Sequence, residues 1–201
     1  TRLQGDWSSD VCSSDLRYTH GHHESVLRSH SWRTVDNSAA YLAPSLVPGA
    51  TVLDIGCGPG TITVDIASRV YPARVVGMDA SAEVIAKAIE FAADRDVDNV
   101  EFVVGNAYEL DYEDGAFDIV HAHQVLQHVS NPVGMLRELR RVRTPDGVVA
   151  ARDVDYGASF WYPASPGLDR WLQLLRAVQY SNEGEPDAGR RLKSWARDAG
   201  F

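Results

Sequence analysis

The stretch that decides the fold is Asp54-Ile-Gly-Cys-Gly-Pro-Gly60, which directly follows the apolar residues Val52 and Leu53. A short apolar run that stops at glycine is typical of a strand buried on both faces of a sheet. Glycines let the backbone turn sharply and let a ligand lie against it. A helix that begins at Thr61 would add unpaired N–H groups and a partial positive charge. The stretch therefore predicts a strand, a ligand-binding loop and a helix in succession.

The rest of the chain alternates between strand and helix patterns. Apolar runs predict strands at 51–55, 74–78, 101–104, 117–121 and 148–153. Helical periodicity predicts helices at 24–43, 61–70, 81–93, 132–143, 168–180 and 188–199. Such alternation is typical of βαβ units, so we expect an α/β fold, a doubly wound parallel sheet in a three-layer αβα sandwich. Ligands of such sheets lie beyond the carboxyl ends of the strands.

The glycine spacing argues against two classes of nucleotide site. The glycines run G-x-G-x-G from Gly56 to Gly60, whereas the dinucleotide fingerprint is G-x-G-x-x-G. The Gly-Lys-Ser/Thr ending of a phosphate loop is absent. Taken alone, the loop leaves open a glycine-rich turn that binds nothing.

Two polar residues follow the next predicted strands. Asp79 ends the second strand, where a carboxylate can accept hydrogen bonds from both hydroxyls of a ribose. The alternative for Asp79 is a cap for the helix that Ser81 begins. Asn106 follows the third strand, and its carbonyl oxygen can accept a hydrogen bond from an amino group.

The segment Asp54–Gly60 resembles the first motif of class I S-adenosylmethionine-dependent methyltransferases, and the later elements match in order. The segment after the fourth strand, His121-Ala-His-Gln-Val-Leu-Gln-His128, resembles the ubiquinone/menaquinone-biosynthesis C-methyltransferase family. The resemblance implies a Rossmann-like enzyme that moves a methyl group from S-adenosylmethionine to a small-molecule acceptor by direct in-line displacement. The alternative is a non-catalytic or truncated S-adenosylmethionine-binding module, and a nicotinamide oxidoreductase is a third hypothesis.

The same resemblance implies which residues bind the cofactor. Asp79 would bind the ribose, and Asn106 would bind adenine where family members usually carry aspartate. His123 and Gln124 would lie beside the sulfonium, and Tyr18 would close over the methionine end. The complete expected set is Tyr18, Asp54, Gly56, Cys57, Gly58, Gly60, Asp79, Ala80, Asn106, Ala107, His123 and Gln124.

The histidines and aromatic residues leave other roles open. His121, His123 and His128 could suggest a metal, but no carboxylate or thiol completes a set, so we expect no metal and a packed His128. The cluster at 20–23 could supply an acid or base, or have no role. No catalytic residue is assigned, because only a hard acceptor needs a base. The aromatic segment 156–166 would either cover the acceptor or pack on neighbouring helices.

Composition excludes several classes of function. The net charge of −9 argues against nucleic-acid binding, which needs concentrated Lys and Arg. No apolar run approaches the roughly 20 residues of a membrane span. We see no secretory signal, and two distant cysteines, Cys12 and Cys57, make no disulfide framework. A cytoplasmic location is the expectation.

Both ends of the chain carry expectations of their own. Residues 6–16, DWSSDVCSSDL, resemble the translation of a common sequencing-library adapter, so residues 1–16 are interpreted as an artefact or a disordered arm. The methyltransferase domain would then be residues 17–201. Family members normally continue with two more strands after a sequence like the one ending at Phe201. We therefore expect a truncated domain with a five-stranded sheet that lacks the last two strands.

Overall fold

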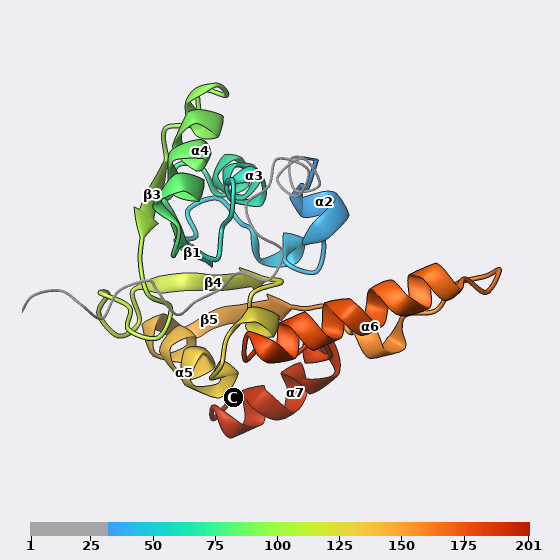
Figure 1. Ribbon diagram of the computed structural model, residues 1–201. Helices are drawn as coiled ribbons and strands as arrows, with labels where there is room; N and C mark the ends of the chain where they lie inside the picture. The colour runs from blue at the N-terminus through green and yellow to red at the C-terminus, as the bar shows by residue number, and fades with distance from the viewer. Residues whose placement is uncertain (1–31) are drawn as a thin grey trace, which may run out of the picture.

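The computed structural model describes residues 32–201, which form an α/β sandwich around one parallel sheet (Figure 1). The strands are β1 (Val52–Ile55), β2 (Val75–Asp79), β3 (Val100–Val104), β4 (Phe117–His123) and β5 (Arg143–Arg152). The α-helices are α2 (Val35–Ser38), α3 (Thr61–Val70), α4 (Ala82–Ala93), α5 (Pro132–Val142), α6 (Pro166–Ser181) and α7 (Ala188–Asp198). Short 3₁₀ turns are η1 (Ala43–Ser45), η2 (Leu126–His128) and η3 (Tyr156–Ala158).

The strand order is β3-β2-β1-β4-β5, and every neighbouring pair is parallel. The order reverses between β1 and β4, which is where doubly wound sheets bind ligands. This confirms the predicted Rossmann-like fold, with five strands within the described residues.

Successive side chains of a strand point to opposite faces of the sheet and pack into two apolar cores. Leu53 and Ile55 of β1 point into the core shared with α5, whereas Val52 points into the core shared with α2 and α3. Figure 1 shows α2, α3 and α4 on one side of the sheet and α5 and α7 on the other. The glycine loop therefore leaves the centre of the sheet with helices on both sides.

Most predicted elements are confirmed within one or two residues. The helix at 61–70 has the predicted bounds, and Ser81 caps α4 by accepting a hydrogen bond from the Val84 N–H group. The strand predicted at 117–121 extends to His123, because His123 pairs in register with Arg152 of β5. His121 and His128 lie on different elements: His121 is in β4 and His128 is in η2.

The helix predicted at 24–43 is wrong in its described part. Only Val35–Ser38 is helical, and turns lead on to η1. The apolar positions Val35, Ala39 and Leu42 are buried as expected, whereas Trp32 is 63% exposed. Burial against α3 fixes these residues without a continuous helix, so the apolar spacing overstated the helix length.

The fifth strand begins earlier than predicted. Strand β5 starts at Arg143, which pairs with Phe117, and the register then shifts so that Val148 pairs with Ile119. The turn residues Pro145-Asp-Gly147 therefore form an irregularity within β5 rather than a connection before it.

The aromatic segment after β5 does not pack as a unit. Phe160 is 92% exposed and Tyr162 is 98% exposed, so of the two alternatives, packing on neighbouring helices is wrong for these two residues. In Figure 1 this segment leads into the far end of α6, which projects from the sandwich.

Three expectations fall on residues 1–31 and lie outside the described residues: the adapter-like segment, Tyr18, and the histidines His20, His22 and His23. Within residues 32–201 no helix is long and apolar enough to cross a membrane. The same residues contain no group of three or more His, Cys, Asp or Glu side chains arranged to hold a metal ion.

Replacing Leu139 with alanine tests the core between the sheet and α5. Leu139 is fully buried there, so L139A should lower the free energy of unfolding by about 2–5 kcal/mol. The matched control L174A removes the same atoms from a side chain that is 49% exposed on α6 and should cost less than about 0.5 kcal/mol. Urea denaturation measures both, and equal losses would contradict the packing described.

Candidate functional site

The glycine loop adopts a backbone that other residues rarely accept. Gly56, Gly58 and Gly60 have φ angles of +65°, +56° and +79°. A Cβ at Gly56 would strike the Val125 side chain, and one at Gly60 would lie 2.9 Å from the Phe102 ring. A Cβ at Gly58 would meet nothing within 4 Å. The outer two glycines thus pack against the protein, while Gly58 borders open space.

Asp79 joins the glycine loop to the next strand. Its Oδ2 accepts a hydrogen bond from the Gly58 N–H group at 3.1 Å, and its Oδ1 accepts one from Ser81 N–H at 3.0 Å. The Cys57 N–H group also donates to the Met78 carbonyl at 3.0 Å. The capping hydroxyl of α4 belongs to Ser81, and each Asp79 oxygen keeps a further lone pair for a ligand.

Asn106 lies at the same edge of the sheet, one strand further out. The Gly105 N–H group donates to the Asp79 carbonyl at 3.1 Å, which holds the ends of β2 and β3 together. Asn106 is exposed, and its Oδ1 accepts a hydrogen bond from Tyr108 N–H at 3.0 Å. Ala80, also exposed, and the half-buried Ala107 flank these two polar residues. The structure therefore brings the predicted Asp79 and Asn106 to neighbouring strand ends.

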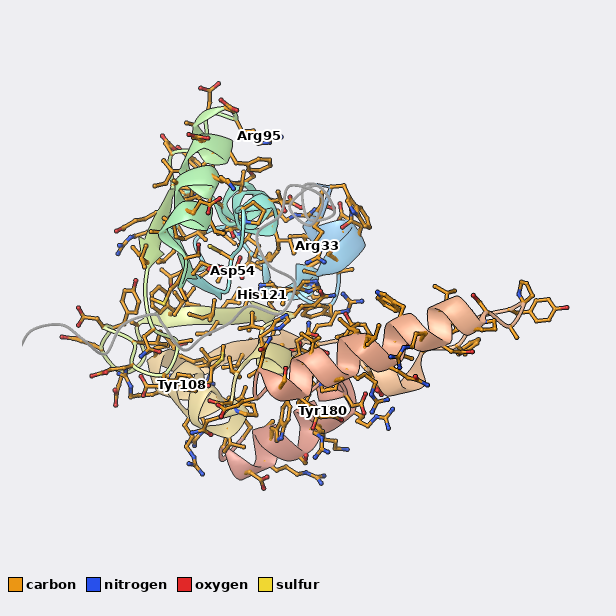
Figure 2. The ribbon with its side chains drawn as sticks, viewed as in Figure 1. Arg33, Asp54, Arg95, Tyr108, His121 and Tyr180 are labelled. Carbon is orange, nitrogen blue, oxygen red and sulfur yellow. The ribbon has the colours of Figure 1, made fainter. Side chains whose placement is uncertain are left out.

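Asp54 lies beneath the loop in a buried polar chain. Its carboxylate is 3% exposed and accepts hydrogen bonds from the Thr63 hydroxyl at 2.6 Å and from His121 Nδ1 at 2.7 Å. His121 Nε2 lies 2.8 Å from the Tyr41 hydroxyl. Burial, followed by the charge of Asp54, raises the pKa of Tyr41. Figure 2 shows Asp54 and His121 side by side at the middle of the sheet.

The end of β4 holds His123 and Gln124. His123 is 8% exposed, and its Nε2 lies 3.5 Å from Nη1 of Arg152 at the end of β5. Gln124 has a positive φ of +58°, its N–H group donates to the Arg152 carbonyl at 2.7 Å, and its Oε1 accepts a hydrogen bond from Arg33 at 3.3 Å. A left-handed conformation at a residue other than glycine is uncommon and concentrates at functional sites.

His123 is electrically neutral at physiological pH. Burial lowers its pKa to about 3, and the neighbouring His121, Arg33 and Arg152 add to the effect. Because a guanidinium only donates, His123 Nε2 accepts from Arg152 and the ring hydrogen sits on Nδ1. Within residues 32–201, Nδ1 has no hydrogen-bond partner. With so low a pKa, His123 is only a weak base, and its Nε2 lone pair is already engaged by Arg152.

Comparison with known proteins shows the family to which the chain belongs. A family described as a methyltransferase domain matches residues 46–195. An uncharacterised methyltransferase of Schizosaccharomyces pombe is 34% identical over 195 residues, which cover 94% of this chain and 70% of that protein. The chain belongs to the S-adenosylmethionine-dependent class I methyltransferases.

Two further comparisons show a second curated relative and a solved structure with the same fold. A demethylmenaquinone methyltransferase of Listeria monocytogenes is 32% identical over 130 residues, covering 64% of this chain and 51% of that protein. A crystal structure of an S-adenosylmethionine-dependent methyltransferase from Aquifex aeolicus shares the fold, with a TM-score of 0.60, 20% identity, and coverage of 77% and 86% of the two chains. The chain thus spans between half and 70% of these curated relatives' length.

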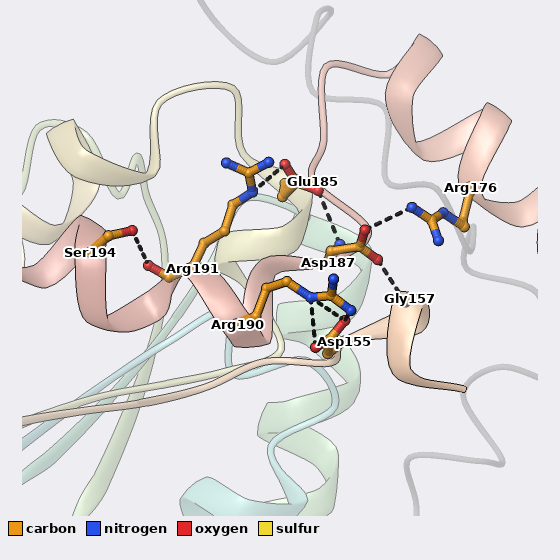
Figure 3. Close-up of polar contacts among 8 residues, drawn as sticks. All are labelled: Asp155, Gly157, Arg176, Glu185, Asp187, Arg190, Arg191 and Ser194. Carbon is orange, nitrogen blue, oxygen red and sulfur yellow. Dashed lines mark hydrogen bonds and ion pairs between the residues drawn. The ribbon is translucent and has the colours of Figure 1, made fainter. Parts of the chain in front are cut away.

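An ionic cluster fixes the segment that follows β5 in the methyltransferase (Figure 3). Arg190 pairs with Asp155 at 2.7 Å, which lowers the pKa of that carboxyl. Asp187 pairs with Arg176 at 2.7 Å and accepts a hydrogen bond from the Gly157 N–H group at 2.7 Å. The Tyr156 N–H group donates to the Pro186 carbonyl at 3.0 Å. The cluster thereby ties residues 155–157, which follow β5, to Pro186, Asp187 and Arg190 at the start of α7.

Sequence reasoning missed this cluster and the role of Asp153. The Asp153 carboxylate accepts hydrogen bonds from the N–H groups of Leu126 and Gln127 at 3.1 and 3.3 Å. Burial raises the pKa of Asp153 to about 7, although these hydrogen bonds act to lower it. The Asp153 pairings join residues 26 and 27 positions apart, and a single sequence carries no signal for them.

The neutral state of His123 predicts a loss of stability in acid. The unfolded chain binds a proton at this histidine below about pH 6.5, whereas the folded protein binds it only near pH 3. The stability that neutral His123 gives the folded protein is therefore fully present above pH 6.5. It declines as the pH falls toward 3, by at most about 1.4 kcal/mol per pH unit. Urea denaturation from pH 7 to 4 should show a shallower decline for H123N than for the natural chain. An NMR titration of His123 near pH 6.5 would contradict the structure.

Proposed function

We propose that S-adenosylmethionine lies across the ends of β1, β2, β3 and β4, held by the residues that the sequence predicted. The main support for this proposal is the open backbone at Gly58, which lies next to the Asp79 carboxylate on the neighbouring strand. A side chain at Gly58 would fill the space where a ligand can approach the loop. The amide groups at the start of α3, whose N-cap Gly60 has no side chain, suit the cofactor's carboxylate.

Each predicted residue has a role in this proposal. Asp79 accepts hydrogen bonds from the ribose hydroxyls, and Asn106 binds the adenine amino group, with Ala80 and Ala107 beside them. Gly56, Cys57, Gly58 and Gly60 shape the loop. Burial raises the pKa of the Cys57 thiol, which keeps it neutral. Asp54 acts from below the loop, where Thr63 and His121 fix its carboxylate.

The remaining members of the set would surround the reacting end. His123 and Gln124 lie at the end of β4, where they border both the cofactor and the acceptor. Tyr18, which the resemblance places over the methionine end, stays part of the proposal and lies outside the described residues. We assign residues 17–201 to one methyltransferase domain.

The proposed reaction is direct transfer of the methyl group to a small-molecule acceptor. The cofactor supplies a methyl group already activated by its sulfonium. The protein then has to align the acceptor and exclude water, and such alignment can supply roughly 7–11 kcal/mol. The relative from Listeria is a demethylmenaquinone methyltransferase, which favours a small ring compound here as well. The net charge of −9 disfavours a nucleic acid as acceptor.

Replacing Asp79 tests the cofactor site. D79A removes the carboxylate expected to bind the ribose, and hydrogen bonds to charged groups contribute about 1.5–3 kcal/mol each. Calorimetric titration with S-adenosylhomocysteine should show an affinity at least tenfold weaker. The control D146A removes an exposed carboxylate in the irregular part of β5 and should leave the affinity unchanged. Unchanged affinity in D79A, or tight NADH binding by the natural chain, would refute the proposal.

Gly58 offers a second test with a closely matched control. Gly58 and Gly49 both have positive φ, and a Cβ at either meets nothing within 4 Å. G58A and G49A should therefore both lose about 1–2 kcal/mol of stability from backbone strain. G58A alone should weaken S-adenosylhomocysteine binding, because only its methyl group enters the proposed cofactor space. Equal affinities for the two variants would remove Gly58 from the site.

A further inference from the structure

Two arginines flank the tip of β4. Arg152 ends β5 in register with His123, and its guanidinium lies 3.5 Å from the His123 ring. Arg33 comes from the segment before α2 and donates to the side chain of Gln124 at 3.3 Å. Both arginines are close enough for their charge to lower the pKa of His123. Figure 2 shows Arg33 beside α2.

The carboxylates near this tip are engaged elsewhere. Asp54 is bound by a histidine and a threonine, Asp153 by two backbone N–H groups of η2, and Asp155 by Arg190. Among the residues the structure describes, Arg152 forms no ion pair, and its neighbour His123 is uncharged. The polar partner of Arg152 is therefore an imidazole, which leaves the positive charge of this guanidinium in place.

From this arrangement, and resting on the proposed function, we infer that the methyl acceptor carries an anionic oxygen, which Arg152 and Arg33 bind at the ends of β4 and β5. A planar guanidinium matches carboxylates and other oxyanions by pairs of parallel hydrogen bonds. The class includes carboxylates and ionised hydroxyl groups of phenols or enols.

An anionic acceptor also explains how methyl transfer proceeds without a general base at the end of β4. His123, with its lowered pKa and with Nε2 facing Arg152, is a weak base and a poor acceptor for a proton from the substrate. An acceptor already ionised beside two cations needs no base. It forms the new bond to the methyl carbon with its own electron pair, while the carbon–sulfur pair leaves with sulfur. No proton moves in that step, and the charges of anion and sulfonium cancel in the products.

The test measures binding of paired probes to the full chain saturated with S-adenosylhomocysteine. The anions are 4-nitrophenolate and benzoate, and their neutral counterparts are 4-nitroanisole and benzamide. We expect the natural chain to prefer an anion to its counterpart by about tenfold or more. Absorbance should show that bound 4-nitrophenol ionises at a lower pH than the free compound. The two anions distinguish an ionised hydroxyl from a carboxylate as the bound group.

Three variants make the test specific. R152Q should abolish the preference, R152K should keep most of it, and R95Q should leave it intact. Arg95 is a matched control because it stacks on Phe91 just past the end of α4, away from β5 (Figure 2). If R152Q does not fold, as judged by thermal melting, R33Q is measured in its place and should reduce the preference.

Equal binding of anions and neutral counterparts, binding of neither anion, or an equal loss in R95Q would overturn the inference. Failure of S-adenosylhomocysteine to bind is seen before any probe is added. That result would count against the proposed cofactor site instead, so the two failures are distinguishable.

Discussion

The buried carboxylate of Asp54 is the group on which this site depends. It is 3% exposed and ties β1 to α3 through Thr63 and to β4 through His121. A charge removed from water is stable only when its oxygens are hydrogen-bonded, so these three elements must keep their relative positions. Strands β1 and β4 flank the point where strand order reverses, and the Asp54–His121 bond spans that point. The glycine loop, which follows Asp54 in the chain, therefore starts from a fixed position.

The carboxyl end of the sheet, where the strands terminate, has two regions of different electrostatic character. Over β2 and β3, Asp79 and Asn106 offer oxygen atoms, which suit the hydroxyl and amino groups of a nucleoside. Over β4 and β5, Arg152 and Arg33 offer positive charge around the neutral His123. The ionic cluster around Asp187 ties the chain after β5 to the start of α7. One edge can thus hold a nucleoside cofactor and an anionic acceptor side by side.

The sequence predicted the elements best where local patterns are strong. The glycine loop, the helix at 61–70 and the Ser81 cap depend on residues close in the chain, and the structure confirms each. The predicted helix at 24–43 failed because apolar spacing reports burial, and the described residues there are buried without forming a continuous helix. The strand at 117–121 was too short because its last two residues owe their extended form to pairing with β5.

The sequence by itself determined the family, the fold class and the strand ends near which Asp54, Asp79 and Asn106 lie, since these follow from motifs and from alternation along the chain. Only the tertiary structure decided which side chains meet. The pairing of Asp54 with His121, 67 positions apart, follows from strand register, which brings both residues to one face of neighbouring strands. The neutral state of His123 follows from burial and from two distant arginines. Local patterns specify elements, whereas charge and protonation depend on what packing places within a few ångströms.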